Sequence, residues 1–228
     1  MALLVLSACD PKDLNNILGS LEESVLTDAD ISNGLKEALQ LGVDKSVQKL
    51  SIENGFYLSD YKIFLPEEAD VVISKLKFIP GFNSLEEELL KKINHAAEDA
   101  ASKAGPIFLD AIKSITFEDA MNILMGDKNA ATVYLHDKTY NSLYSEFKPV
   151  LVNSLNKFGA LDLWSDAVNK YNSLPLVKDV NPDLADHINT KALYALFNLI
   201  ESKEMGIRTD ISQRTSQLLR RVFARQDS

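Results

Sequence analysis

Residues 84–112 read SLEEELLKKINHAAEDAASKAGPIFLDAI, and this stretch decides the fold class. Apolar and small residues recur along it at the spacing of one helix face. The residues of this face are Leu85, Leu89, Ile93, Ala96, Ala97 and Ala100. Ser84 and Glu87 have the spacing of a capping box, and Gly105-Pro106 predicts a break or kink. The three alanines predict that another helix packs closely against this one.

The sequence on both sides of this stretch is also predominantly helical. Pro66-Glu67-Glu68 marks a helix start, and the capping-box pair Thr116 and Asp119 opens a helix that ends at Gly126. The further predicted helices span residues 32–50, 129–158 (as one helix or two), 181–205 and 210–223. With no βαβ alternation, these patterns predict an all-α fold, a single irregular bundle of about eight helices. Alternating Tyr61, Ile63 and Leu65 give the one strand signal, a small hairpin near residues 52–65.

Composition agrees with a helical, acidic protein. The 228 residues include only nine Gly and seven Pro, and the net charge is −9. An acidic surface repels the phosphate backbone, so no nucleic-acid partner is predicted. All five arginines fall in the last 21 residues, which points to a specialised C-terminal helix.

The N-terminus carries the pattern Leu6-Ser7-Ala8-Cys9, which is typical of a bacterial lipoprotein-processing site. It predicts a signal remnant in 1–8, lipidation at Cys9, a polar tether in 9–30 and a helical domain in 31–228. No Lys or Arg precedes Lys12, so either translation starts upstream or the segment is an ordinary apolar N-terminus. The lipoprotein interpretation predicts a cell-envelope protein, held to a membrane by its lipid and facing the periplasm or the exterior.

Six segments resemble one bacterial family. They read GLKEALQLGVDKSVQKL, IFLPEE, INHAAEDAASKAGPIFLDAI, TFEDAMNILMGDKNAATVYL, TKALYALFNLIESKEMGIR and QRTSQLLRRVF. In order and wording they are similar to the family called domain of unknown function 4197, over roughly residues 30–224. The resemblance implies an exported, all-helical and often lipoprotein-like protein with no assigned activity. His95 and Leu135-His136 depart from the arginine-containing wording that is common there.

Several polar residues lie inside segments that otherwise have the pattern of a core. The candidate ligand-binding or structural cluster comprises Asn94, His95, Glu98, Thr132, Tyr134, Glu204, Arg208 and Arg214. One interpretation is that they cap helices and form ion pairs that tie the C-terminal helix to the body, with Arg208 and Arg214 paired with carboxylates such as Glu98 or Glu204. On this interpretation Arg221 and Arg225 are the more exposed arginines. The other interpretation is a polar cleft between helices that binds a small ligand.

Catalytic motifs are absent from the sequence. His95 and Glu98 could supply two metal ligands, but no further ligands have a suitable spacing. There is no nucleophile elbow, phosphate loop or dinucleotide fingerprint, so no catalytic residue, metal or cofactor is predicted. Two hypotheses remain. The favoured one is a non-catalytic envelope lipoprotein that binds a partner protein or a small or apolar ligand. The alternative is an enzyme that uses Glu98 and His95 for acid–base chemistry in a polar cleft.

Overall fold

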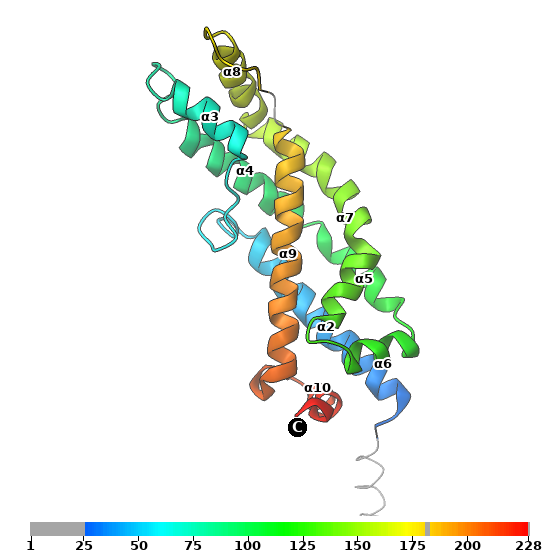
Figure 1. Ribbon diagram of the computed structural model, residues 1–228. Helices are drawn as coiled ribbons and strands as arrows, with labels where there is room; N and C mark the ends of the chain where they lie inside the picture. The colour runs from blue at the N-terminus through cyan, green and yellow to red at the C-terminus, as the bar shows by residue number, and fades with distance from the viewer. Residues whose placement is uncertain (1–25, 181–182, 228) are drawn as a thin grey trace, which may run out of the picture.

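The computed structural model describes residues 26–180 and 183–227, which contain nine α-helices and no strand (Figure 1). The all-α prediction is therefore confirmed. Cys9, the signal remnant and most of the predicted tether lie outside the described residues. The α-helices are α2 (Asp28–Ser51), α3 (Glu67–Leu76), α4 (Leu85–Ala101), α5 (Ala104–Lys113), α6 (Phe117–Met125), α7 (Ala130–Lys157), α8 (Ala160–Asn172), α9 (Leu184–Thr209) and α10 (Gln217–Phe223).

Local capping explains where several helices begin. Thr116 and Asp119 form the predicted capping box at the start of α6, which ends before Gly126. A second capping box joins Thr27 to Asp30 and starts α2 at Asp28, so the last residues assigned to the tether are helical. The capping box predicted at Ser84 is wrong, because its hydroxyl donates to Glu88 Oε1 at 2.6 Å and caps no backbone group.

The bundle is elongated, and α9 runs along most of its length (Figure 1). Helices α3 and α8 lie at one end, with the start of α4, whereas α6 and α10 lie at the other. Helix α9 packs against α7, α2 and α4, and α4 also packs against α7. As predicted, Ala96, Ala97 and Ala100 are fully buried, which allows α4 to approach its neighbours closely. None of the described helices combines the length and apolar character needed to cross a membrane.

Two predicted elements differ in the structure. Residues 52–61 form turns and bends, and residues 62–66 belong to neither a helix nor a strand, so the hairpin prediction is wrong. The predicted continuous helix from Asp210 to Phe223 is also interrupted. A short 3-10 helix, η1 (Ile211–Gln213), is followed by non-helical Arg214 and by Ser216, whose side chain caps α10. The interruption redirects α10 across the first helix of the bundle.

The last helix packs on the first one. At Gly34 of α2, an added Cβ would lie 2.6 Å from Val222 Cγ2 of α10, so no larger residue fits there without movement. Arg221 Nη2 lies 3.6 Å from Asp30 Oδ2 beside this contact. The two ends of the described chain therefore close one end of the bundle together.

Candidate binding site

Two polar side chains of α4 hold an irregular loop in place. Asn94 is fully buried; its Oδ1 accepts a hydrogen bond from Ile63 N at 2.8 Å, and its Nδ2 donates to Ile63 O at 2.9 Å. One turn further on, Glu98 Oε1 accepts from the backbone N–H groups of Phe56 at 3.1 Å and Tyr57 at 3.4 Å. Because buried backbone groups need partners, these side chains replace the missing second strand.

His95 completes this arrangement. Its Nδ1 lies 2.8 Å from Glu98 Oε2, and its ring packs 5.9 Å from the ring of Phe158. The His95 side chain is only 19% exposed. Both carboxylate oxygens of Glu98 are thus engaged within the protein. We call Asn94, His95 and Glu98 the polar clamp.

The loop held by the polar clamp, residues 55–65, carries aromatic side chains, and we call it the aromatic loop. Its aromatic residues are Phe56, Tyr57, Tyr61 and Phe64. Lys62 Nζ lies 4.5 Å from the ring centre of Tyr57 and 5.7 Å from that of Phe64, distances typical of cation–π contacts. Burial raises the pKa of the Tyr61 hydroxyl, to which Asp60 adds a smaller effect.

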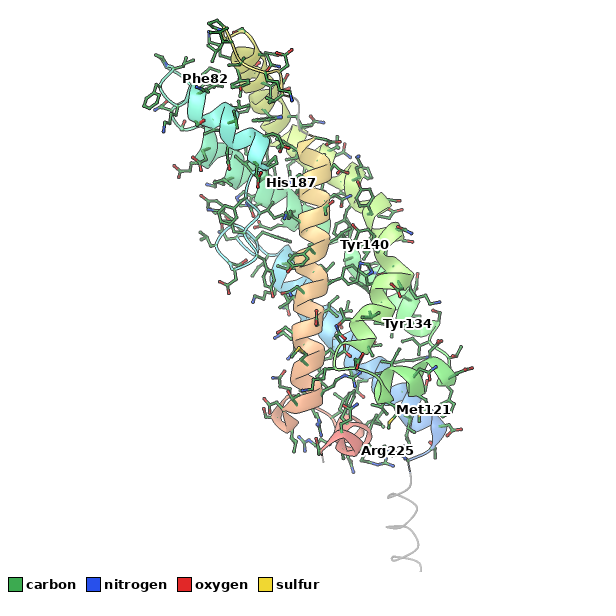
Figure 2. The ribbon with its side chains drawn as sticks, viewed as in Figure 1. Phe82, Met121, Tyr134, Tyr140, His187 and Arg225 are labelled. Carbon is green, nitrogen blue, oxygen red and sulfur yellow. The ribbon has the colours of Figure 1, made fainter. Side chains whose placement is uncertain are left out.

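A groove of about 530 Å³ separates the aromatic loop and the start of α3 from α9. Tyr61, Phe64, His187 and Tyr194 are among its lining residues. His187, labelled on the half of α9 nearer α3 in Figure 2, contacts Phe64 O through Nε2 at 2.9 Å. Phe64 and Tyr194 are 66% and 68% exposed, an unusual state for large aromatic side chains. We call this hollow the α9 groove.

The second group of predicted residues forms a separate site near the opposite end of the bundle. Glu204 accepts hydrogen bonds from Ala131 N at 3.0 Å, Thr132 N at 2.8 Å and Thr132 Oγ1 at 2.8 Å, so its carboxylate caps the start of α7. Arg208 Nε donates to Glu204 Oε1 at 2.9 Å. The rest of its guanidinium group donates to Leu124 O at 3.1 Å and to Ile123 O at 2.8 Å, at the end of α6.

Arg214 is 1% exposed and makes the densest set of contacts. It donates to Ile207 O and Arg208 O, both at 2.9 Å, and to both carboxylate oxygens of Asp227 at 2.6 Å. Both arginines pair with carboxylates as predicted, Arg208 with Glu204, but the partner of Arg214 is Asp227 and neither Glu98 nor Glu204, because the interruption before α10 directs Arg214 to the end of the chain. We call Thr132, Glu204, Arg208, Arg214 and Asp227 the arginine cluster.

The remaining predicted side chains lie apart from both groups. Tyr134 is half-buried on α7, where burial and the nearby Asp119 raise the pKa of its hydroxyl. Arg221 is 31% exposed and lies near Asp30, whereas Arg225 is fully exposed. The polar clamp and the arginine cluster therefore account for the predicted residues except Tyr134, and they do not converge on one cleft.

Sequence reasoning missed Phe64, His187 and Tyr194. Residues 57–64 are rich in aromatic side chains, which could have indicated a binding loop, but their alternation predicts a strand instead. Tyr194 and His187 lie more than 120 residues further on, and only the packing of α9 brings them to the loop.

No internal chamber for a lipid-like ligand is found among the pockets of the described residues. The apolar pocket between α2 and α9 holds about 20 Å³, room for roughly one water molecule. The larger hollows, including the α9 groove, are open at the surface. Within the described residues, no group of three or more His, Cys, Asp or Glu side chains could hold a metal ion.

Comparison with known proteins identifies the family. The sequence model described as "Protein of unknown function (DUF4197)" matches residues 25–224. The chain belongs to this family. No curated protein and no solved structure matches this DUF4197 chain. The match begins just before α2 and ends just after α10, so it includes the polar clamp, the α9 groove and most of the arginine cluster.

Proposed function

We propose that this DUF4197 protein is a non-catalytic binding protein of the bacterial cell envelope. A lipid on Cys9 holds it to a membrane, and the body binds a partner protein in the α9 groove. The observation that carries the binding role is the exposure of Phe64 and Tyr194, which both line one groove and are each about two-thirds open to solvent. Aromatic side chains are the residues that most often dominate the energy of protein interfaces.

The rigidity of the aromatic loop supports this role. Asn94 and Glu98 fix the loop through four backbone hydrogen bonds, so its side chains keep their positions before a partner arrives. A surface that is already ordered loses less conformational entropy on binding. The acid–base alternative has less support, because the groups around Glu98 occupy both of its oxygens and leave it 4% exposed.

The small size of the internal pocket favours a protein partner over a buried apolar ligand. A drug-sized ligand needs a cavity of roughly 300–1,000 Å³ that encloses most of its surface. The pocket between α2 and α9 offers about 20 Å³, and the α9 groove is open along its length. An open groove with exposed aromatic walls suits one segment of a larger molecule.

Site-specific photo-crosslinking tests the binding role. A crosslinking residue at position 194 or 64, in cells that make the full-length protein, should form a discrete adduct with a partner protein. Val133, which is 49% exposed on α7, provides the matched control position. Adducts at position 194 that disappear in an Asn94→Ala background would support the proposal. Equal crosslinking at positions 194 and 133 would contradict it.

The anchor is tested separately. In a precursor that carries its native start, Cys9→Ala should abolish incorporation of a labelled fatty acid and leave the chain uncleaved. Cys9→Ser keeps nearly the same side-chain volume and should behave in the same way, because lipidation requires sulfur. Recovery of a normally processed, soluble Cys9→Ala protein from the periplasm would show that the lipoprotein interpretation is wrong.

A further inference from the structure

Two loops at one end of the bundle carry the most exposed large apolar side chains of the described residues. One loop, residues 77–84, joins α3 to α4, and the other, residues 173–178, follows α8. Phe78 in the first loop is 83% exposed, and Leu176 in the second is fully exposed. Both loops lie at the end of the bundle beyond α3 and α8, away from the start of α2 (Figure 1). We call residues 77–84 and 173–178 the tip loops.

The neighbours of these two side chains pack inward. In the first loop, Ile79 and Phe82 pack against the core, and Phe82 is labelled at this end of the molecule in Figure 2. In the second loop, Leu174 and Val177 pack against the core on either side of Leu176. Each loop is therefore held to the body by its partly buried residues, while its most exposed apolar side chain projects into solvent.

The backbone of Leu176 is in an unfavourable conformation for a leucine. Its φ is 64°, in the left-handed region that glycine and asparagine occupy more readily. Leu176 follows Pro175 in a turn, and its side chain buries no area within the protein that would offset this strain. A strained backbone that presents a fully exposed apolar side chain indicates a contact outside the protein.

Charge at this end of the bundle is balanced. Lys77 and Lys178 are the only charged residues within the tip loops, and Lys77 Nζ lies 5.0 Å from the ring centre of Phe78. The charged residues that flank the loops are two more lysines and four carboxylates, namely Lys75, Lys170, Glu86, Glu87, Glu88 and Asp179. The four lysines and four carboxylates give this end no net charge with which to select a charged partner.

The shape of the tip favours a fluid partner. Phe78 and Leu176 line neither the α9 groove nor the other pockets found among the described residues, so both side chains protrude. A partner protein would need a matching, well-packed pocket for each protruding side chain. A lipid bilayer accepts protruding apolar side chains without a preformed pocket, and exposed apolar surface is typical of membrane contacts.

We propose that the tip loops insert Phe78 and Leu176 into the surface of a lipid bilayer. The two side chains enter the boundary between headgroups and acyl chains, while Lys77 and Lys178 keep their ammonium groups among the headgroups. Burial of apolar area drives this contact, so it requires no anionic lipid. The inference goes beyond the proposed function, because it uses neither the α9 groove nor the lipid on Cys9.

Fluorescence from a single labelled cysteine tests the insertion. Cys9 is the only cysteine, so the full chain with Cys9→Ala accepts an environment-sensitive NBD label at Leu176→Cys or at Phe78→Cys. Phosphatidylcholine vesicles should shift the emission of either label to the blue and increase its intensity, because the label leaves water. A label at Met125→Cys, which is 66% exposed on α6 at the opposite end, provides the control and should not respond.

A second substitution measures the contribution of the first loop. With the label at position 176, Phe78→Ser should raise the lipid concentration at half-maximal response by about tenfold, because the apolar area of the phenylalanine no longer leaves water. Val133→Ser, at a 49% exposed position of α7, is the matched control and should leave this concentration unchanged. Phe78 and Val133 are both exposed, so neither substitution should disturb the core.

Three results would overturn the inference. They are no response at either tip position, equal responses at position 125 and at the tip, and a response that appears only when the vesicles contain phosphatidylglycerol. If vesicles give no response but a photo-crosslinker at position 176 forms a discrete protein adduct in cells, the tip binds a protein and not a bilayer. Crosslinking at position 194 is independent of all these outcomes, so the proposed function is tested separately.

Discussion

The polar clamp and the arginine cluster both bury polar side chains, but the first bonds to an irregular loop and the second to the ends of helices. In the arginine cluster, Glu204 caps the start of α7. Arg208 binds carbonyls at the end of α6, and Arg214 binds a carbonyl at the end of α9, so the cluster links these helices to one another. The polar clamp instead holds a segment with no helix or strand partner. A buried polar network is therefore not by itself a sign of function. The informative feature is what the network holds and what that part of the chain exposes.

The two groups also differ in charge. The arginine cluster joins full charges through bidentate contacts, whereas the polar clamp relies on an amide and one carboxylate that bond to neutral backbone groups. Losing the buried Arg214 leaves the Ile207 and Arg208 carbonyls and the partly exposed Asp227 without a partner, whereas losing Asn94 leaves only neutral backbone groups unpaired. The contrast predicts a ranking of mutational effects.

Arg214→Met should have the largest effect. It removes the guanidinium group that bonds to Ile207 O, Arg208 O and Asp227, and we expect the free energy of unfolding to fall by about 3–5 kcal/mol, because charge-assisted hydrogen bonds to two buried carbonyls are lost with the ion pair. Urea denaturation of the purified protein measures this change. Arg225→Ala, at an exposed position of the same segment, should change the free energy of unfolding by less than about 0.5 kcal/mol. Equal effects of the two variants would mean that the arginine cluster contributes no stability.

Asn94→Ala should rank second. It leaves the N–H and C=O of Ile63 unpaired, and two buried backbone groups at about 1–3 kcal/mol each predict a loss of roughly 2–4 kcal/mol. The aromatic loop should also become sensitive to limited proteolysis between residues 55 and 65. Asn94→Asp should lose at least as much at pH 7, because it buries a carboxylate whose second oxygen would face the carbonyls of Ile63 and Leu90. Unchanged protease resistance in Asn94→Ala would show that the loop is held by packing alone.

Ala97→Leu tests the helix that carries the polar clamp. Ala97 is fully buried on α4, and a larger side chain there should overpack the contact with neighbouring helices, at a cost of about 1–3 kcal/mol. Thermal unfolding followed by circular dichroism measures this change. Lys91→Leu, at an exposed position of the same helix, provides the control. A change within about 0.5 kcal/mol for Ala97→Leu would mean that α4 is not closely packed.

The smallest expected effect depends on pH. Hydrogen bonds from Arg214 lower the pKa of Asp227 below 3.8, the ordinary value for an aspartate. A group with a lowered folded-state pKa stabilises the protein above the unfolded pKa, and this stabilisation is lost as the pH falls through the folded value. Asp227→Asn should therefore lower the Tm at pH 7, and its difference from the parent protein should shrink as the pH falls below 3.8. A difference in Tm that does not shrink below that pH would contradict this assignment.

The sequence predicted features that depend on neighbouring residues. The capping box of Thr116 and Asp119 forms within one helical turn, and the buried face of α4 follows from its periodicity. The predicted hairpin failed for a long-range reason. The alternation of Ile63 and Leu65 indicates a strand, but the backbone groups of Ile63 bond to the side-chain amide of Asn94, about 30 residues away, and not to a second strand.

The candidate site was predictable only in part. Asn94 and Glu98 stand out because polar residues interrupt an apolar face, and that signal is local. The partner of Arg214 depends on a turn before α10 that redirects the chain toward Asp227, and the helical pattern contains no sign of this turn. The α9 groove depends on the packing of His187 and Tyr194 beside the aromatic loop, which no pattern within either segment encodes.

The contact between Gly34 and Val222 has a consequence for how the chain matures. During synthesis, α2 emerges from the ribosome first and α10 emerges last, yet each covers part of the other. The nascent polypeptide therefore cannot complete its packing until nearly all of its residues have been made. A chain that stays incompletely folded until its final segment appears exposes part of its apolar core throughout synthesis. Because α10 packs against Gly34 only after it has been made, the fold is completed only when translation is nearly finished.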